Sequence, residues 1–104
     1  MNFDQYQSKT RETVIYERKN KFVYLLLGLA SEVGEVSDLF KKHIRDGNLI
    51  EYKDLIKELG DVLWYLARIS DELDIPLSHI AEENISKLQG RKERGTLNGS
   101  GDDR

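Results

Sequence analysis

Apolar residues recur at intervals of three and four along most of the chain, which is the period of an α-helix, and the alternation typical of strands is scarce. The clearest run has spacings of four, three, four, three and four residues, at Leu55, Leu59, Val62, Leu66, Ile69 and Leu73. The pattern predicts an all-α fold of four helices in a bundle-like arrangement, over residues 3–18, 22–45, 51–73 and 77–90.

Polar residues that favour helix ends support these boundaries. Asn2 or Asp4 is suited to cap the first predicted helix, and Asp74 or Ser78 to cap the fourth. The run Asp46-Gly47-Asn48 is suited to end the second, because glycine readily adopts the left-handed conformation that follows a helix. We therefore expect short connections between separate helices.

The composition fits one small soluble domain. The chain has 104 residues, 38% of them hydrophobic, and its longest apolar run, residues 22–27, is far too short to cross a bilayer. The absence of cysteine excludes disulfides, thiolate metal sites and cysteine nucleophiles. We expect a cytoplasmic protein in which residues 1–94 fold and the polar residues 95–104 form a flexible tail or a loop that a ligand orders.

The charge balance restricts the partners. Sixteen basic and nineteen acidic residues give a net charge of −3, which argues against nucleic acid held by phosphate contacts. An anionic ligand would therefore need local basic groups or bound cations.

Two pairs of carboxylates interrupt the apolar pattern of the second and third predicted helices. Glu32 falls in the middle of the apolar face of residues 22–45, and Glu35 lies about 60° around the helix, at the edge of that face. Glu58 and Asp61 have the same spacing along the flank of the stripe in residues 51–73. If the two helices pack side by side, both pairs converge on one gap.

Carboxylates gathered between helices are costly unless each is protonated, finds a cation or shares a metal ion. Oxygen ligands alone fit Mg²⁺, with Mn²⁺ as a substitute, better than zinc or copper. Iron is the rival, but the Glu-x-x-His signature of di-iron bundles is absent, because Phe40 and Pro76 precede His43 and His79 by three residues. Either pair alone would fit a solvated face, whereas both pairs together, with Glu32 inside an apolar stripe, favour a metal site.

The fourth predicted helix has a comparable break in its pattern. Asn84 lies inside the apolar stripe, with Lys87 and Arg91 on the adjoining edge. These two cations are suited to bind phosphate oxygens, or alternatively to neutralise Glu83 and the helix C-terminus. Trp64, nearly opposite the main stripe of its own helix, is expected to face either a second subunit or the base of a ligand.

Four stretches carry a more specific signal when taken together: residues 28–35 (GLASEVGE), 41–42 (KK), 57–65 (KELGDVLWY) and 84–88 (NISKL). In this order they resemble the MazG-like nucleotide pyrophosphohydrolases of the all-α NTP pyrophosphatase group, over residues 22–94. The resemblance implies that group's all-α fold, a homodimer or homotetramer, and an enzyme that cleaves a (d)NTP between the α and β phosphates to (d)NMP and pyrophosphate.

The resemblance also implies roles for individual residues. The four carboxylates that would bind Mg²⁺ are Glu32, Glu35, Glu58 and Asp61. The residues that would contact the substrate phosphates are Asn84, Lys87 and Lys41, to which the spacing on the last helix adds Arg91. We further assign to Glu35 the orientation or deprotonation of the attacking water. The family pattern Glu-Glu-x-x-Glu begins here with Ser31, so one family carboxylate is missing.

Two other functions stay open at this point. The same metal site would serve an alarmone or a non-canonical nucleotide equally well, because carboxylates do not specify a base. Alternatively, the chain is a catalytically silent helical interaction module whose acids form ion pairs between subunits, and Ser31 adds weight to this alternative. Apolar residues around most of the third predicted helix favour at least a homodimer in every case.

Overall fold

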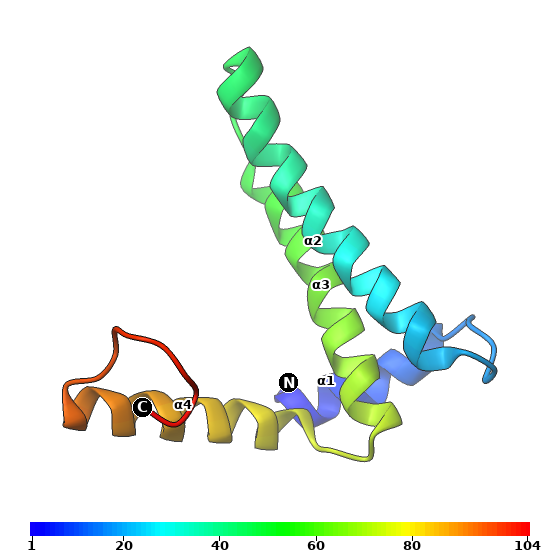
Figure 1. Ribbon diagram of the computed structural model, residues 1–104. Coiled ribbons are helices and arrows are strands. Elements are labelled where there is room, and N and C mark those ends of the chain that lie inside the picture. Colours follow the sequence, from blue (N-terminus) through cyan, green and yellow to red (C-terminus); the bar gives the residue numbers. More distant parts are fainter.

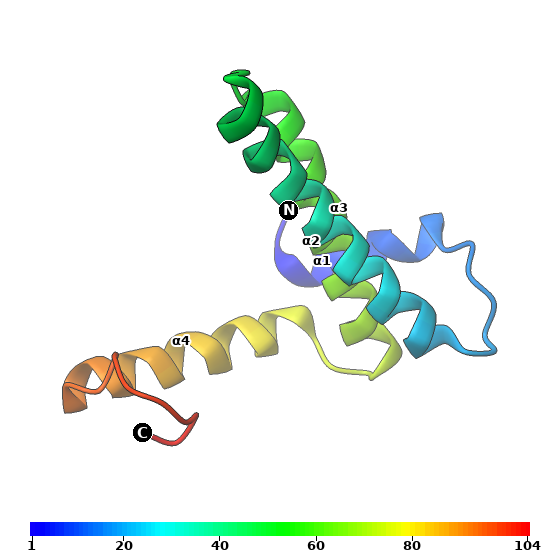
Figure 2. The same ribbon diagram turned by 45° about the horizontal axis from the view of Figure 1, so that its top comes forward.

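The computed structural model describes residues 1–104 and is entirely helical, which confirms the predicted all-α class with four α-helices (Figure 1). The elements are α1 (Phe3–Thr10), the 3₁₀ turn η1 (Arg11–Thr13), α2 (Lys21–Asp46), α3 (Tyr52–Glu72) and α4 (Leu77–Arg94). α2 and α3 form a long antiparallel hairpin, and α1 packs against the end of α3. α4 leads away from the hairpin in both views (Figure 2).

Two predicted helix boundaries were wrong. The first helix ends at Thr10 rather than at residue 18, because the β-branched run Thr13-Val14-Ile15 disfavours a helix and Val14 adopts extended geometry. The fourth helix continues past residue 90 to Arg94, and it ends where Gly95 takes the left-handed conformation, with φ of 70°.

The predicted C-terminal end of α2 and the predicted Asn2 cap at the start of α1 are confirmed, whereas the predicted cap of α4 was wrong. Gly47 ends α2 with φ of 73°, and Asn2 caps α1 by accepting a hydrogen bond from the Gln5 amide at 2.9 Å. Neither Asp74 nor Ser78 caps α4. Instead Asp4 and Gln7 of α1 accept hydrogen bonds from the backbone amides that begin α4, at 3.1 and 2.7 Å. These hydrogen bonds to α1 therefore help to fix the orientation of α4.

A buried arginine ties the N-terminal segment to α3. Arg68 is 3% exposed, and its guanidinium donates to the Tyr16 hydroxyl at 3.1 Å and to Thr10 Oγ1 at 3.3 Å. Arg68 also pairs with Asp71 at 2.7 Å and with Glu72 at 3.0 Å. A buried charge of this kind is tolerated only when it is fully paired and hydrogen-bonded.

Further cations reach the same two carboxylates from the N-terminal segment. Arg11 hydrogen-bonds Asp71 and, with desolvation opposing it, lowers the pKa of that carboxyl to about 2. Arg18 and Lys21 contact Glu72 at 2.8 and 3.1 Å and hold its pKa at about 2. This charge network fixes the chain between α1 and α2 against the end of α3.

The isolated chain is open. Its radius of gyration is 16.6 Å, whereas a compact domain of this length has about 13 Å. Nine of the 104 residues are buried, and large apolar side chains are exposed on every long helix, including Leu27, Ile56 and Ile85. No helix of the chain has both the length and the apolar character needed to cross a membrane.

Candidate metal centre

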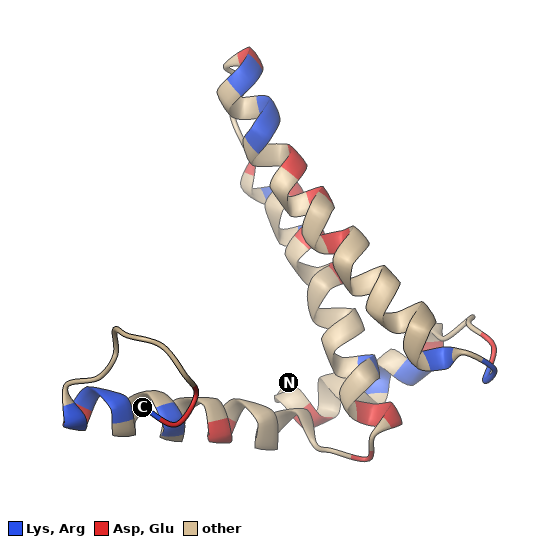
Figure 3. Ribbon diagram, viewed as in Figure 1, with Lys and Arg blue, Asp and Glu red and all other residues tan.

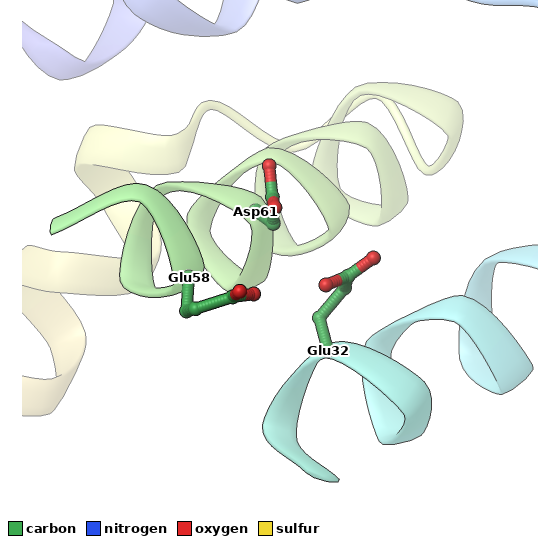
Figure 4. A group of neighbouring side chains, drawn as sticks. All are labelled: Glu32, Glu58 and Asp61. Atoms are coloured by element: carbon green, nitrogen blue, oxygen red, sulfur yellow. The ribbon is translucent and has the colours of Figure 1, made fainter. Parts of the chain in front are cut away.

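Three of the four predicted carboxylates meet at the middle of the hairpin. Glu32 projects from α2 toward α3, where Glu58 and Asp61 lie one turn apart (Figure 4). One oxygen from each side chain lies within 4.8 Å of the other two. The antiparallel packing of α2 against α3 therefore brings together residues that are 26 to 29 positions apart in the sequence.

The electrostatics of the cluster favour a cation. Partial burial is the main cause that raises the pKa of Glu32, and the negative charges of Asp61, Glu58 and Glu35 raise it further. Every neighbouring charge that shifts this pKa is negative, so the cluster has no internal counter-ion. Figure 3 shows acidic residues gathered along this part of the hairpin, with basic residues toward its tip.

The donor set fits Mg²⁺. Three carboxylate oxygens supply only hard ligands, and two rigid helices hold them. Glu32, Glu58 and Asp61 would hold such an ion, and the ion would neutralise charge on phosphate oxygens. A nitrogen or sulfur ligand, which zinc or copper would favour, is absent from the cluster.

Glu35, the fourth predicted ligand, does not join the cluster. It lies nearly one turn beyond Glu32 on α2 and is exposed, although its charge is close enough to raise the pKa of Glu32. The structure thus separates three converging carboxylates from a fourth that faces solvent beside them.

A hollow of about 370 Å³ adjoins the cluster. Besides Glu32 and Asp61, its walls are formed by Thr13, Ile15, Tyr24, Trp64 and Tyr65. Trp64 donates its indole N–H to Thr13 Oγ1 at 2.8 Å, so the segment after α1 holds this ring in place. The sequence pattern does not identify Thr13 and Ile15 as site residues, because they lie in an irregular segment without periodicity.

The predicted phosphate contacts lie elsewhere on the chain. Asn84 and Lys87 are exposed on α4, where they border a second hollow, of about 830 Å³. Arg91 is also on α4, but it is 5% exposed and donates to the C-terminal tail. Lys41 pairs with Asp38 at 3.0 Å on α2. The structure brings neither Lys41 nor the α4 residues to the carboxylate cluster of the same chain.

Residues 20–96 match the family model of the MazG nucleotide pyrophosphohydrolase domain. The chain belongs to this family. Gene 37 protein of Mycobacterium phage L5 is 39% identical to it over an alignment of 114 positions that spans the whole of both chains, and its name states no activity. No solved structure matches the chain.

The MazG match covers the three clustered carboxylates and all of α4. It indicates a nucleotide pyrophosphohydrolase, and this family depends on divalent metal, for which the acidic cluster is the corresponding feature. The match begins at residue 20, so Thr13 and Ile15, which wall the hollow beside the cluster, lie outside the MazG domain. Ser31, where the family pattern has a carboxylate, is exposed next to Glu32.

Proposed function

We propose that the chain is a Mg²⁺-dependent nucleoside triphosphate pyrophosphohydrolase. In the reaction, a water oxygen forms a new P–O bond, the bridging P–O bond between the α and β phosphates breaks, and the products are (d)NMP, pyrophosphate and a proton. The observation that carries the proposal is the convergence of Glu32, Glu58 and Asp61 inside a matching MazG domain.

The residues divide the work as follows. Glu32, Glu58 and Asp61 would hold the metal, which supplies charge neutralisation and a more acidic bound water. Glu35 lies outside the cluster and faces solvent, which suits a group that orients the attacking water and accepts its proton. Because the chain carries a net charge of −3, a triphosphate also needs cations from the protein, and Lys87 and Arg91 supply them.

The hollow beside the cluster supports a nucleotide as the substrate. Tyr24, Trp64 and Tyr65 give it aromatic walls, and it opens next to Glu32 and Asp61. A nucleobase has a flat face that stacks on such rings. This arrangement would place a base beside the metal ligands, as cleavage near the α phosphate requires.

The test measures products directly. The purified protein is incubated with each common NTP and dNTP, with and without Mg²⁺, and pyrophosphate is quantified against orthophosphate. We expect Mg²⁺-dependent pyrophosphate and monophosphate, lost in Glu32→Gln and retained in Glu82→Gln, a matched change at an exposed acid on α4. Orthophosphate as the product would refute cleavage between the α and β phosphates. No product from common nucleotides would leave alarmones and non-canonical nucleotides to be assayed in the same way.

A second measurement separates the two roles predicted for Glu35. If Glu35 orients water, Glu35→Gln lowers turnover strongly while Mg²⁺ still raises the melting temperature as it does in the wild type. If Glu35 is a metal ligand, the same variant loses the Mg²⁺-induced shift together with its activity.

We infer further that the protein is a homodimer or homotetramer. Many large apolar side chains of α2 and α3 are exposed in the isolated chain, and α4 carries its cations away from the cluster of its own chain. A second copy would cover these side chains and place its Lys87 near the first copy's carboxylates. A 12.1 kDa species in sedimentation equilibrium would refute the oligomer. Activity restored by mixing Glu32→Gln with Lys87→Ala would support a site shared between copies.

A further inference from the structure

The last ten residues form a closed loop that lies back along α4 (Figures 1 and 3). Gly95 reverses the chain with φ of 70°, and the Thr96 amide returns to the Arg91 carbonyl at 2.8 Å. The guanidinium of Arg104 donates to four backbone carbonyls within the loop, including Gly101 at 2.6 Å and Thr96 at 3.0 Å. Polar contacts thus hold together a segment that has little apolar content of its own.

The loop brings the carboxylate of Asp102 into contact with two cations of α4, Lys87 and Arg91. Asp102 Oδ1 lies 3.5 Å from Lys87 Nζ and 3.3 Å from an Arg91 guanidinium nitrogen. The same nitrogen donates to the Asp102 backbone carbonyl at 2.7 Å. Lys87 is the main cause that lowers the pKa of Asp102. Figure 3 shows the acidic part of the tail beside the basic C-terminal half of α4.

The geometry of the two cations is typical of an anion site that is already partly occupied. Arg91 is 5% exposed, and its Nε is buried without a hydrogen-bond partner, so the contact with the tail leaves one donor of this guanidinium unsatisfied. The Asp102 side chain is 85% exposed, so water or a competing anion can reach it. An ion pair whose carboxylate is this exposed is weak, and a polyphosphate, with several charged oxygens, can displace a single carboxylate.

We propose that residues 95–104 form an autoinhibitory strap, in which Asp102 occupies Lys87 and Arg91 and a polyphosphate must displace it in order to bind. The inference rests on the proposed function, because that function assigns these cations to the substrate phosphates. Displacement of Asp102 by phosphate oxygens would release the tail from α4. The strap therefore raises the concentration of nucleotide at which the site fills.

The first test is binding, not turnover. Inorganic tripolyphosphate is titrated calorimetrically, in the presence of Mg²⁺, into the full-length wild type, Asp102→Asn and the matched control Asp103→Asn. Both variants lose one negative charge from neighbouring positions, but only Asp102 contacts Lys87 and Arg91. Removal of an exposed pair of this kind should tighten binding about two- to five-fold in Asp102→Asn. Asp103→Asn should change the affinity by less than half as much.

A second measurement follows the tail itself. In the wild type, the heteronuclear NOE of the Gly99 and Gly101 amides should fall when tripolyphosphate saturates the protein, because the loop leaves α4. Unchanged NOE values at saturation, equal affinities of the two variants, or no binding by any of the three proteins would each overturn the strap. Failure of the proposed function would look different, since tripolyphosphate would displace the tail while no nucleotide yields pyrophosphate.

Discussion

Replacement of Glu32 by glutamine should stabilise the metal-free protein and abolish its response to Mg²⁺. The two effects have one cause, namely three carboxylates that converge without a counter-ion. Glutamine keeps the shape of glutamate but removes one charge, so the repulsion from Glu58 and Asp61 disappears together with a ligand. The same cluster without a metal role would show the first effect but not the second.

The size of the first effect follows from the distances. The closest carboxylate oxygens lie within 4.8 Å of one another. Two unit charges at that separation repel by about 0.9 kcal/mol in water and about 3.5 kcal/mol at the effective dielectric constant near a protein surface. Glu32 is only half-buried and salt screens its neighbours, so the lower value applies to each of two partners. The free energy of unfolding of metal-free Glu32→Gln should therefore exceed that of the wild type by about 1–2 kcal/mol at pH 7.

Urea unfolding at low ionic strength, at a fixed protein concentration and with or without Mg²⁺, measures both effects. At ten times its Kd, Mg²⁺ should stabilise the wild type by about 1.4 kcal/mol and Glu32→Gln by almost nothing. The pKa of Glu32 is raised, so the wild type binds a proton more tightly when folded and gains stability as pH falls through that pKa. The difference in free energy of unfolding between metal-free Glu32→Gln and the wild type should therefore become smaller as pH falls. Destabilised metal-free Glu32→Gln, or an undiminished Mg²⁺ response, would refute the reasoning.

Three further substitutions test other parts of the structure. Gly28→Ala would place a methyl group 2.1 Å from Cε1 of Tyr65, so it should displace this ring and lower activity in a nucleotide assay. Gly34 has open space around it, so Gly34→Ala should instead stabilise α2 by up to about 1 kcal/mol in thermal unfolding. Arg68→Met should cost about 2–3 kcal/mol in urea unfolding, because its two carboxylate partners keep other cations. The carboxyls of Asp71 and Glu72 have pKa values of about 2, so the stability that they give to the folded protein is present above pH 5 and is lost as pH falls toward 2. This loss of folding stability in acid should be smaller in Arg68→Met. Ser31→Glu should strengthen the Mg²⁺-induced thermal shift if the missing family carboxylate weakens the site.

Periodicity predicted the hairpin and its carboxylates well, because both are local properties of amphipathic helices. The stripe from Leu55 to Leu73 fixed α3 to within one residue at each end, and Glu32 was predicted to face α3 because it interrupts an apolar face. The three carboxylates that converge could thus be predicted before any contact was known. Glu35 was grouped with them because helical spacing gives the angle between two residues but not the reach of their side chains.

The remaining features depend on contacts between distant parts of the chain. The amides that begin α4 are satisfied by Asp4 and Gln7, some 70 residues earlier, and no local pattern indicates such a cap. The order of the tail likewise depends on Arg104, whose guanidinium bonds backbone carbonyls rather than side chains. Composition describes this segment as polar, but it does not say that a single arginine closes it into a loop.

Under the proposed function, the distribution of charge gives the cations of α4 a role at the site on the hairpin. Three carboxylates carry one more negative charge than a single Mg²⁺ ion neutralises, so the cluster with its metal still repels a triphosphate. The excess must be offset by a second cation that arrives with the substrate, by Lys87 and Arg91, or by both. The Asp102 carboxylate pairs with Lys87 and Arg91, and Asp102 is remote in sequence from every carboxylate of the cluster. The proposed strap would therefore control nucleotide binding without any change in the three carboxylates that we propose as metal ligands.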